Sequence, residues 1–181
     1  MDIGAYGEYT IRVTHGDGTT ECRKVRNKLN RRFRQAVLQT LHTSIGSNWN
    51  VYAMAFGDTP EPPADTDWQL YGEFWRTTSL AMSPSSVPET GDHITWTMTM
   101  LHNEHLSDWP TGTACREAGV FVTMANPDHA SERQMLSRVA VVPEVTRYAG
   151  DTIQFDFTIT MLLNGMTSTD ERSNGGFGGG C

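Results

Sequence analysis

Apolar and polar residues alternate over several short stretches of the chain, and the clearest stretch is 152–161. There Ile153, Phe155, Phe157, Ile159 and Met161 alternate with Thr, Gln and Asp. A period of two residues puts successive side chains on opposite faces of a β-strand. The same alternation, or a short apolar run between turn residues, predicts strands at about 8–14, 19–25, 50–56, 75–82, 94–100, 117–124 and 134–142.

One segment has helical spacing instead of strand spacing. Its apolar residues share one helix face: Phe33, Val37, Leu38 and Leu41. Asn30 is a suitable N-cap, so we predict a single helix at about 31–42. Arginines in its first turn oppose the helix dipole, which suggests that a carboxylate or a partner neutralises them.

Many strands without alternating helices indicate antiparallel sheets. We therefore expect a mainly β fold, an antiparallel β-sandwich or jelly roll with one short N-terminal helix, as a single domain over 1–166. Residues 167–181 are rich in glycine and end in Cys181. We expect this tail to be flexible unless a partner orders it.

Composition limits the classes of protein that fit. The 181 residues, 38% hydrophobic and 19% charged, suit one loop-rich globular domain. No apolar run approaches the roughly 20 residues of a membrane helix, and residues 1–4 do not begin a secretion signal. We expect no membrane partner, and production in a cytoplasm.

The charge of the chain is unevenly distributed. Half of the fourteen basic residues fall in a segment without acids: Arg23, Lys24, Arg26, Lys28, Arg31, Arg32 and Arg34. The other bases are outnumbered by twenty-one acids, so the chain outside this segment is strongly acidic. We expect the basic segment to dock on an acidic surface, including that of another copy. A nucleic-acid surface usually belongs to a basic domain, so nucleic acid is disfavoured, while a merely solvated face stays open.

Residues suited to catalysis or metal binding occur only in weak patterns. His102 and His105 are three residues apart in a predicted loop, whereas zinc proteases place two histidines four apart on a helix. Ser137 has no Gly-x-Ser-x-Gly context. Cys115 beside a histidine would be a nucleophile, but a small buried side chain is the simpler interpretation. We expect no enzyme activity, cofactor, metal or small-molecule ligand.

The three cysteines are Cys22, Cys115 and Cys181. An odd count without a secretion signal favours reduced thiols. Cys181, in the Gly-rich tail, is the thiol that we expect to be exposed and able to cross-link to another chain.

Charged residues also interrupt predicted strands. Arg138 lies in an apolar strand, and a buried arginine requires a carboxylate partner, for which Glu73 and Glu117 are the candidates. Glu73 and Arg76 are three residues apart near the start of a predicted strand, and both are candidates for structural ion pairs. The alternative is that these side chains face solvent.

Short motifs in a particular order resemble a group of tailed-bacteriophage virion proteins, of the tail-fibre and baseplate-attachment kind. The matching pieces are Asn27-Lys28-Leu29, Phe56-Gly57-Asp58, Leu70 with Glu73 and Arg76, Glu117-Ala118-Gly119-Val120-Phe121, Leu136-Ser137-Arg138, and the strand at 153–161. The chain departs from the pattern in Val120, where Leu is usual, in a longer 102–114 loop, and in its tail.

The resemblance implies a non-enzymatic virion structural protein. It would be an adaptor or fibre-attachment subunit of the tail, baseplate or collar, contacting copies of itself and neighbouring virion proteins. A capsid cement or decoration protein is the first alternative. A carbohydrate-binding sandwich is the second, with a sugar platform drawn from its five tryptophans, of which Trp68 and Trp109 lie in predicted loops and are the ones to test (the others are Trp49, Trp75 and Trp96).

Overall fold

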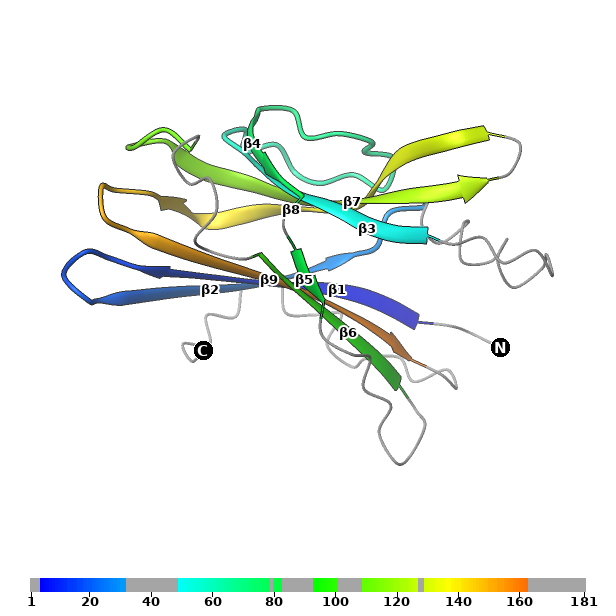
Figure 1. Ribbon diagram of the computed structural model, residues 1–181, viewed down its shortest axis with the longest axis horizontal. Helices are drawn as coiled ribbons and strands as arrows, with labels where there is room; N and C mark the ends of the chain where they lie inside the picture. The colour runs from blue at the N-terminus through cyan, green and yellow to red at the C-terminus, as the bar shows by residue number, and fades with distance from the viewer. Residues whose placement is uncertain are drawn as a thin grey trace.

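The computed structural model describes residues 4–31, 49–78, 80–82, 93–100, 109–126 and 129–162. Within these ranges, nine strands form two antiparallel sheets packed in two layers (Figure 1). The expected mainly β, sandwich-like fold is thus confirmed. The predicted helix, apart from Arg31, and the tail at 167–181 lie outside the described residues. No described helix has the length and apolar character needed to cross a membrane.

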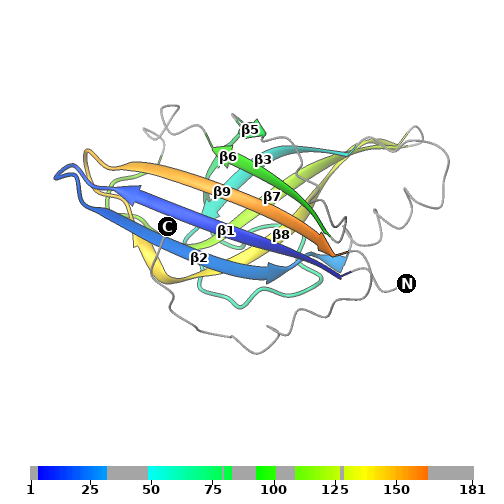
Figure 2. The same ribbon diagram turned by 90° about the horizontal axis from the view of Figure 1, so that it is seen from below.

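The first sheet has five strands. Their order is β2 (Thr20–Lys28), β1 (Gly4–Thr14), β9 (Thr152–Leu162), β6 (His93–Met100) and β5 (Leu80–Met82). Figure 2 shows β2, β1, β9 and β6 side by side, with the other sheet behind them. Across β1 and β9, Tyr9 lies opposite Phe157 and Ile11 lies opposite Phe155. All four side chains are buried, as the alternation predicts.

The second sheet has four strands, in the order β4 (Glu73–Thr77), β3 (Trp49–Gly57), β7 (Ala114–Asn126) and β8 (His129–Thr146). The single strand predicted at 75–82 is wrong. Its first part is β4, in the four-stranded sheet, and its last part is β5, in the five-stranded sheet. The chain changes layers between Thr77 and Leu80, and a hydrophobic pattern carries no information about which sheet a residue joins.

Aromatic side chains fill the space between the layers. Phe56 of β3 stacks on Trp75 of β4, with ring centroids 5.4 Å apart, and meets Phe155 of β9 edge to face at 4.8 Å. Trp109 is 0% exposed and lies 5.0 Å from Phe56. Its indole N–H donates to the Thr113 carbonyl at 3.2 Å. Trp109 is therefore a core residue and cannot stack on a sugar. The expectation that Trp109 belongs to a sugar platform is wrong.

Candidate functional site

Residues 58–72, which we call the clamped loop, link β3 to β4. Leu70 of this loop packs in a second, smaller apolar cluster with Ala53, Ala55, Phe121 and Met135. Ala53 and Ala55 lie on β3 between Met54 and Phe56, which are buried in the main core. Residues 53–56 of β3 are therefore buried on both faces of the sheet, and the clamped loop covers the outer face there. In Figure 1 the loop lies above the four-stranded sheet.

A buried arginine holds the clamped loop to the sheet. Arg138 of β8 is 1% exposed, and its Nε donates to Glu117 Oε2 at 2.6 Å. Its Nη1 donates to Asp67 Oδ2 at 2.9 Å, and both carboxylates are at most 2% exposed. The guanidinium also donates to the carbonyls of Pro62 and Glu61, at 3.3 and 2.9 Å. One side chain thus joins β8, β7 and three positions of the loop.

The two carboxylates make further bonds that fix the loop. Glu117 Oε1 accepts from the Gly72 N–H at 2.7 Å, and Asp67 accepts from the Ala64 N–H at 2.8 Å. The amide of Asn30 donates to the carbonyl of Asp67. A buried ion pair is costly unless its remaining donors and acceptors are satisfied, and here they are largely satisfied. The network therefore favours a single loop conformation.

Two glycines leave the room that this packing needs. A Cβ on Gly57 would lie 2.2 Å from Glu117 Oε1, and a Cβ on Gly119 would lie 2.9 Å from Leu70 Cδ2. The motifs around Gly57, Glu117 and Arg138, which stand far apart in the sequence, therefore meet at one place. Their common role is to seat the clamped loop.

The structure settles which acid pairs with which arginine. Arg138 pairs with Glu117, whereas Glu73 pairs with Arg76 through two hydrogen bonds of 2.7 and 2.6 Å. The hydrogen bonds to Glu73 raise the pKa of Arg76, whose guanidinium also lies 3.9 Å from the Phe121 ring centroid. Sequence reasoning missed Asp67, because nothing in the sequence distinguishes it from the exposed acids of the same loop.

The outer side of the clamped loop is acidic and aromatic. Trp68 and Tyr71 are 61% and 59% exposed. Tyr71 is held in place, since its ring lies 4.6 Å from the Arg138 guanidinium and its hydroxyl donates to Asp67 at 3.1 Å. The hydrogen bond to Asp67 raises the pKa of Tyr71. The remaining acids of the loop, Asp58, Glu61 and Asp65, are exposed, and residues 58–72 include no Lys or Arg.

The basic residues of β2, which we expected to belong to one surface, lie on different faces of the strand. Arg23 lies opposite the core residue Ile11 in the β1–β2 register, and it pairs with Glu21 at 2.9 Å. Lys24 and Arg26 lie on the outer face of β2 and are exposed. Arg31, also exposed, donates its backbone N–H to the Asp65 carbonyl at 3.1 Å. Arg32, Arg34 and Cys181 lie outside the described residues.

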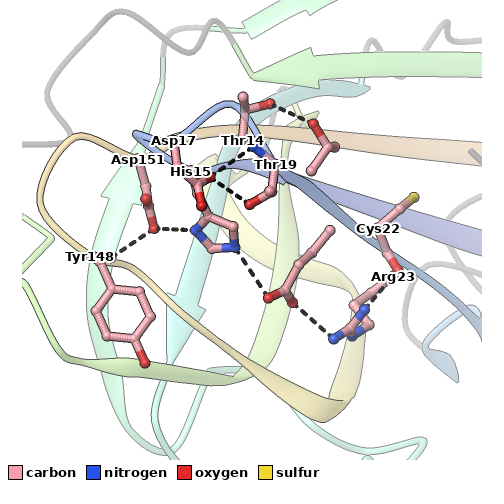
Figure 3. Close-up of polar contacts among 10 residues, drawn as sticks. Thr14, His15, Asp17, Thr19, Cys22, Arg23, Tyr148 and Asp151 are labelled. Carbon is pink, nitrogen blue, oxygen red and sulfur yellow. Dashed lines mark hydrogen bonds and ion pairs between the residues drawn. The ribbon is translucent and has the colours of Figure 1, made fainter.

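His15 joins the β1–β2 hairpin to the turn between β8 and β9, a contact that sequence reasoning missed and that we call the His15 clasp (Figure 3). His15, in the turn after β1, lies between two carboxylates. Its Nδ1 is 3.1 Å from Asp151, beside β9, and its Nε2 is 3.1 Å from Glu21 of β2. The hydrogen bonds to Glu21 and Asp151 raise the pKa of His15. Both ring nitrogens of His15 face carboxylates, and neither faces a hydroxyl or a thiol. The arrangement therefore lacks the nucleophile of a nucleophile–base pair, and its role is to hold these segments together.

The remaining candidates for chemistry have plain structural roles or are not described. Cys115 is 0% exposed, and burial raises the pKa of its thiol, which disfavours the reactive thiolate. Cys22, in contrast, is disulfide-bonded. The expectation of reduced thiols is therefore wrong for Cys22, because composition cannot show which thiols the fold brings together.

His102 and His105 lie outside the described residues, so the structure does not bear on the weak metal pattern there. Within the described ranges, no group of three or more His, Cys, Asp or Glu side chains is arranged to hold a metal ion.

Comparisons with protein-family models, with curated proteins and with solved structures give no match to this chain.

Proposed function

We propose that this chain is a non-enzymatic structural protein of a tailed-bacteriophage particle. It serves as an adaptor or fibre-attachment subunit in the tail, baseplate or collar, and it acts through contacts with copies of itself and with neighbouring virion proteins. The chain is made in the host cytoplasm and works in the virion.

The observation that carries this proposal is the meeting of the motifs at the clamped loop. The pieces that resemble the virion proteins include Gly57, Leu70, Glu117, Gly119 and Arg138, and these are the residues that seat the loop. Together these residues fix the clamped loop, whose outer side is a rigid exposed surface. A rigid surface suits a subunit that binds neighbours, because less conformational entropy is lost on docking.

The distribution of charge supports assembly as well. The exposed acids of the clamped loop lie over the four-stranded sheet, and the exposed Lys24 and Arg26 lie on the other sheet. Complementary surfaces on one chain favour contact between copies, as repeated parts of a particle require.

Immuno-electron microscopy tests the proposal directly. An antibody against the chain is applied to purified particles from the culture that carries the gene. Label at the tail, baseplate or collar is the expected result. Label spread over the shell would replace the adaptor role with the capsid cement or decoration role. Particles without label, while the protein remains in the lysate, would overturn both virion roles.

A carbohydrate-binding module is the second candidate, and the exposure of Trp68 favours it. An indole that is 61% exposed on a pinned loop with carboxylates nearby resembles a sugar-stacking platform. Glycan-array binding that disappears in Trp68→Ala supports this candidate. Trp109→Phe is the matched control, since Trp109 is buried and the substitution should leave any glycan binding unchanged.

A further inference from the structure

We propose that the clamped loop of one copy docks on the outer face of β2 in a second copy, so that chains join head to tail. This inference rests on the proposed function and names the surfaces that carry the self-assembly. The partner that covers the clamped loop is thus a basic surface of a second copy of the same protein.

The loop side of the contact has the composition of a binding hot spot. Trp68 and Tyr71 are both more than half exposed, and Trp and Tyr are enriched among the residues that contribute most of the binding energy at interfaces. Asp67 and Arg138 hold this part of the loop from below. The exposed carboxylates around the aromatics favour a cationic partner, since aromatic faces and carboxylates both attract Lys and Arg.

The receiving side is the outer face of β2. The register places Lys24 opposite Thr10 and Arg26 opposite Glu8 on this face. The Arg26 side chain remains 55% exposed although it pairs with Glu8 at 2.9 Å. Its guanidinium also lies 5.3 Å from the Tyr6 ring centroid, so an aromatic side chain already packs beside this cation.

Position in the fold explains why these cations face a second copy. Arg31, the last residue of the basic segment that the structure describes, is bonded through its backbone to Asp65 of the loop in the same chain. Lys24 and Arg26 belong to the five-stranded sheet, whereas the clamped loop covers the outer face of the four-stranded sheet. These outer faces point in opposite directions in Figure 1.

The symmetry of the assembly follows from this placement. Because the two surfaces lie on opposite faces, two copies cannot make both contacts with each other at once. The contact is therefore heterologous, and repeating it produces a closed ring or an open stack and not a two-fold dimer. The aromatic anchors supply most of the affinity, and the exposed charges mainly set orientation and association rate.

Sedimentation velocity on the full chain in low salt, over a range of concentrations, tests the contact. The variants are Trp68→Ala, Glu61→Lys, Lys24→Glu and the double variant Glu61→Lys/Lys24→Glu. We expect Trp68→Ala to weaken self-association about tenfold or more, in line with a hot-spot effect. Each single charge reversal should weaken it by a smaller but measurable factor, because it replaces an exposed attraction with a repulsion. The double variant, and an equimolar mixture of the two single charge variants, should recover much of the association. Ala149→Lys adds a positive charge in the exposed β8–β9 turn and should have no effect.

Three results would overturn the inference without deciding the proposed function. The first is self-association that none of the variants changes. The second is loss of association in Trp68→Ala without rescue by the charge exchange, which would place another surface against the loop. The third is a chain that is monomeric at every concentration and salt, and labelling of the particle then decides the proposed function independently.

Discussion

Arg138 and Glu117 form an ion pair that water barely reaches. Arg138 Nε lies 2.6 Å from Glu117 Oε2, and the two side chains are 1% and 0% exposed. The pair joins neighbouring strands β8 and β7, and through Asp67 and Gly72 it also holds the clamped loop. Its removal should therefore affect both the stability of the domain and the order of the loop.

Substitution of Arg138 by alanine should lower the free energy of unfolding by about 3–5 kcal/mol, because it leaves two carboxylates buried without their cation. Denaturant unfolding measures this change. Arg116→Ala is the control, since Arg116 pairs with Glu144 at 2.6 Å but both side chains are more than 40% exposed. The control should cost at most about 1 kcal/mol. Equal losses in both variants would show that burial does not strengthen the Arg138 network.

A methyl group at position 119 should displace Leu70. In Gly119→Ala the new Cβ would meet Leu70 Cδ2 at 2.9 Å, and such overpacking typically costs about 1–3 kcal/mol. Limited proteolysis should then cut the 58–72 segment faster than in the wild type. Gly16→Ala serves as the control, since the nearest atom to its Cβ is 3.8 Å away. If the loop of Gly119→Ala is cut at the wild-type rate, Leu70 does not anchor it.

The His15 clasp should stabilise the protein more in acid than in base. The pKa of His15 is raised in the folded state, chiefly by its hydrogen bonds to Glu21 and Asp151. Its contribution is therefore fully present below the unfolded pKa of about 6.5 and is lost as the pH rises through the higher folded value. The fall in melting temperature caused by His15→Gln should be larger at pH 5.5 than at pH 9.

An NMR titration of the His15 ring gives the folded pKa directly. The midpoint should lie above about 6.5, and it should decrease in Glu21→Gln, because the Glu21 hydrogen bond is the largest cause of the shift. A midpoint that Glu21→Gln leaves unchanged would contradict the clasp as described.

The cysteines should differ in reactivity. Alkylation of the native protein without reductant should spare Cys115, which is buried with a raised thiol pKa, and Cys22, which is disulfide-bonded. In denaturant without reductant, Cys115 should be labelled and Cys22 should not. Peptide mapping by mass spectrometry distinguishes the sites. Labelling of Cys22 before reduction would contradict its disulfide.

Strands that bury one face were predictable from the sequence. In β9, Ile153, Phe155 and Phe157 are all buried as the alternation requires, because a half-buried strand imposes its period on its own residues. In β3 the alternation was also visible, but the burial of Ala53 and Ala55 was not. Their cover comes from the clamped loop, and small apolar residues fit beneath a loop and on a solvated face alike.

The sequence also showed that Arg138 needed an acid, but it left Glu73 and Glu117 as equal candidates. Partners across strands depend on register, and the β7–β8 pairing shifts between Cys115 and Glu117 and again between Val120 and Phe121. Such shifts in register decide which side chains face each other across the strands, and no local sequence pattern predicts them.

By itself, then, the sequence determined the β class of the protein, most of its strands and the uneven charge, since these follow from each residue's own character and spacing. Only the tertiary structure decided that the 75–82 segment divides between two sheets and that Asp67 joins Arg138. It also decided that Trp109 is core while Trp68 is exposed. Each of these depends on contacts between residues far apart in the chain, and such contacts arise only when the layers and loops pack together.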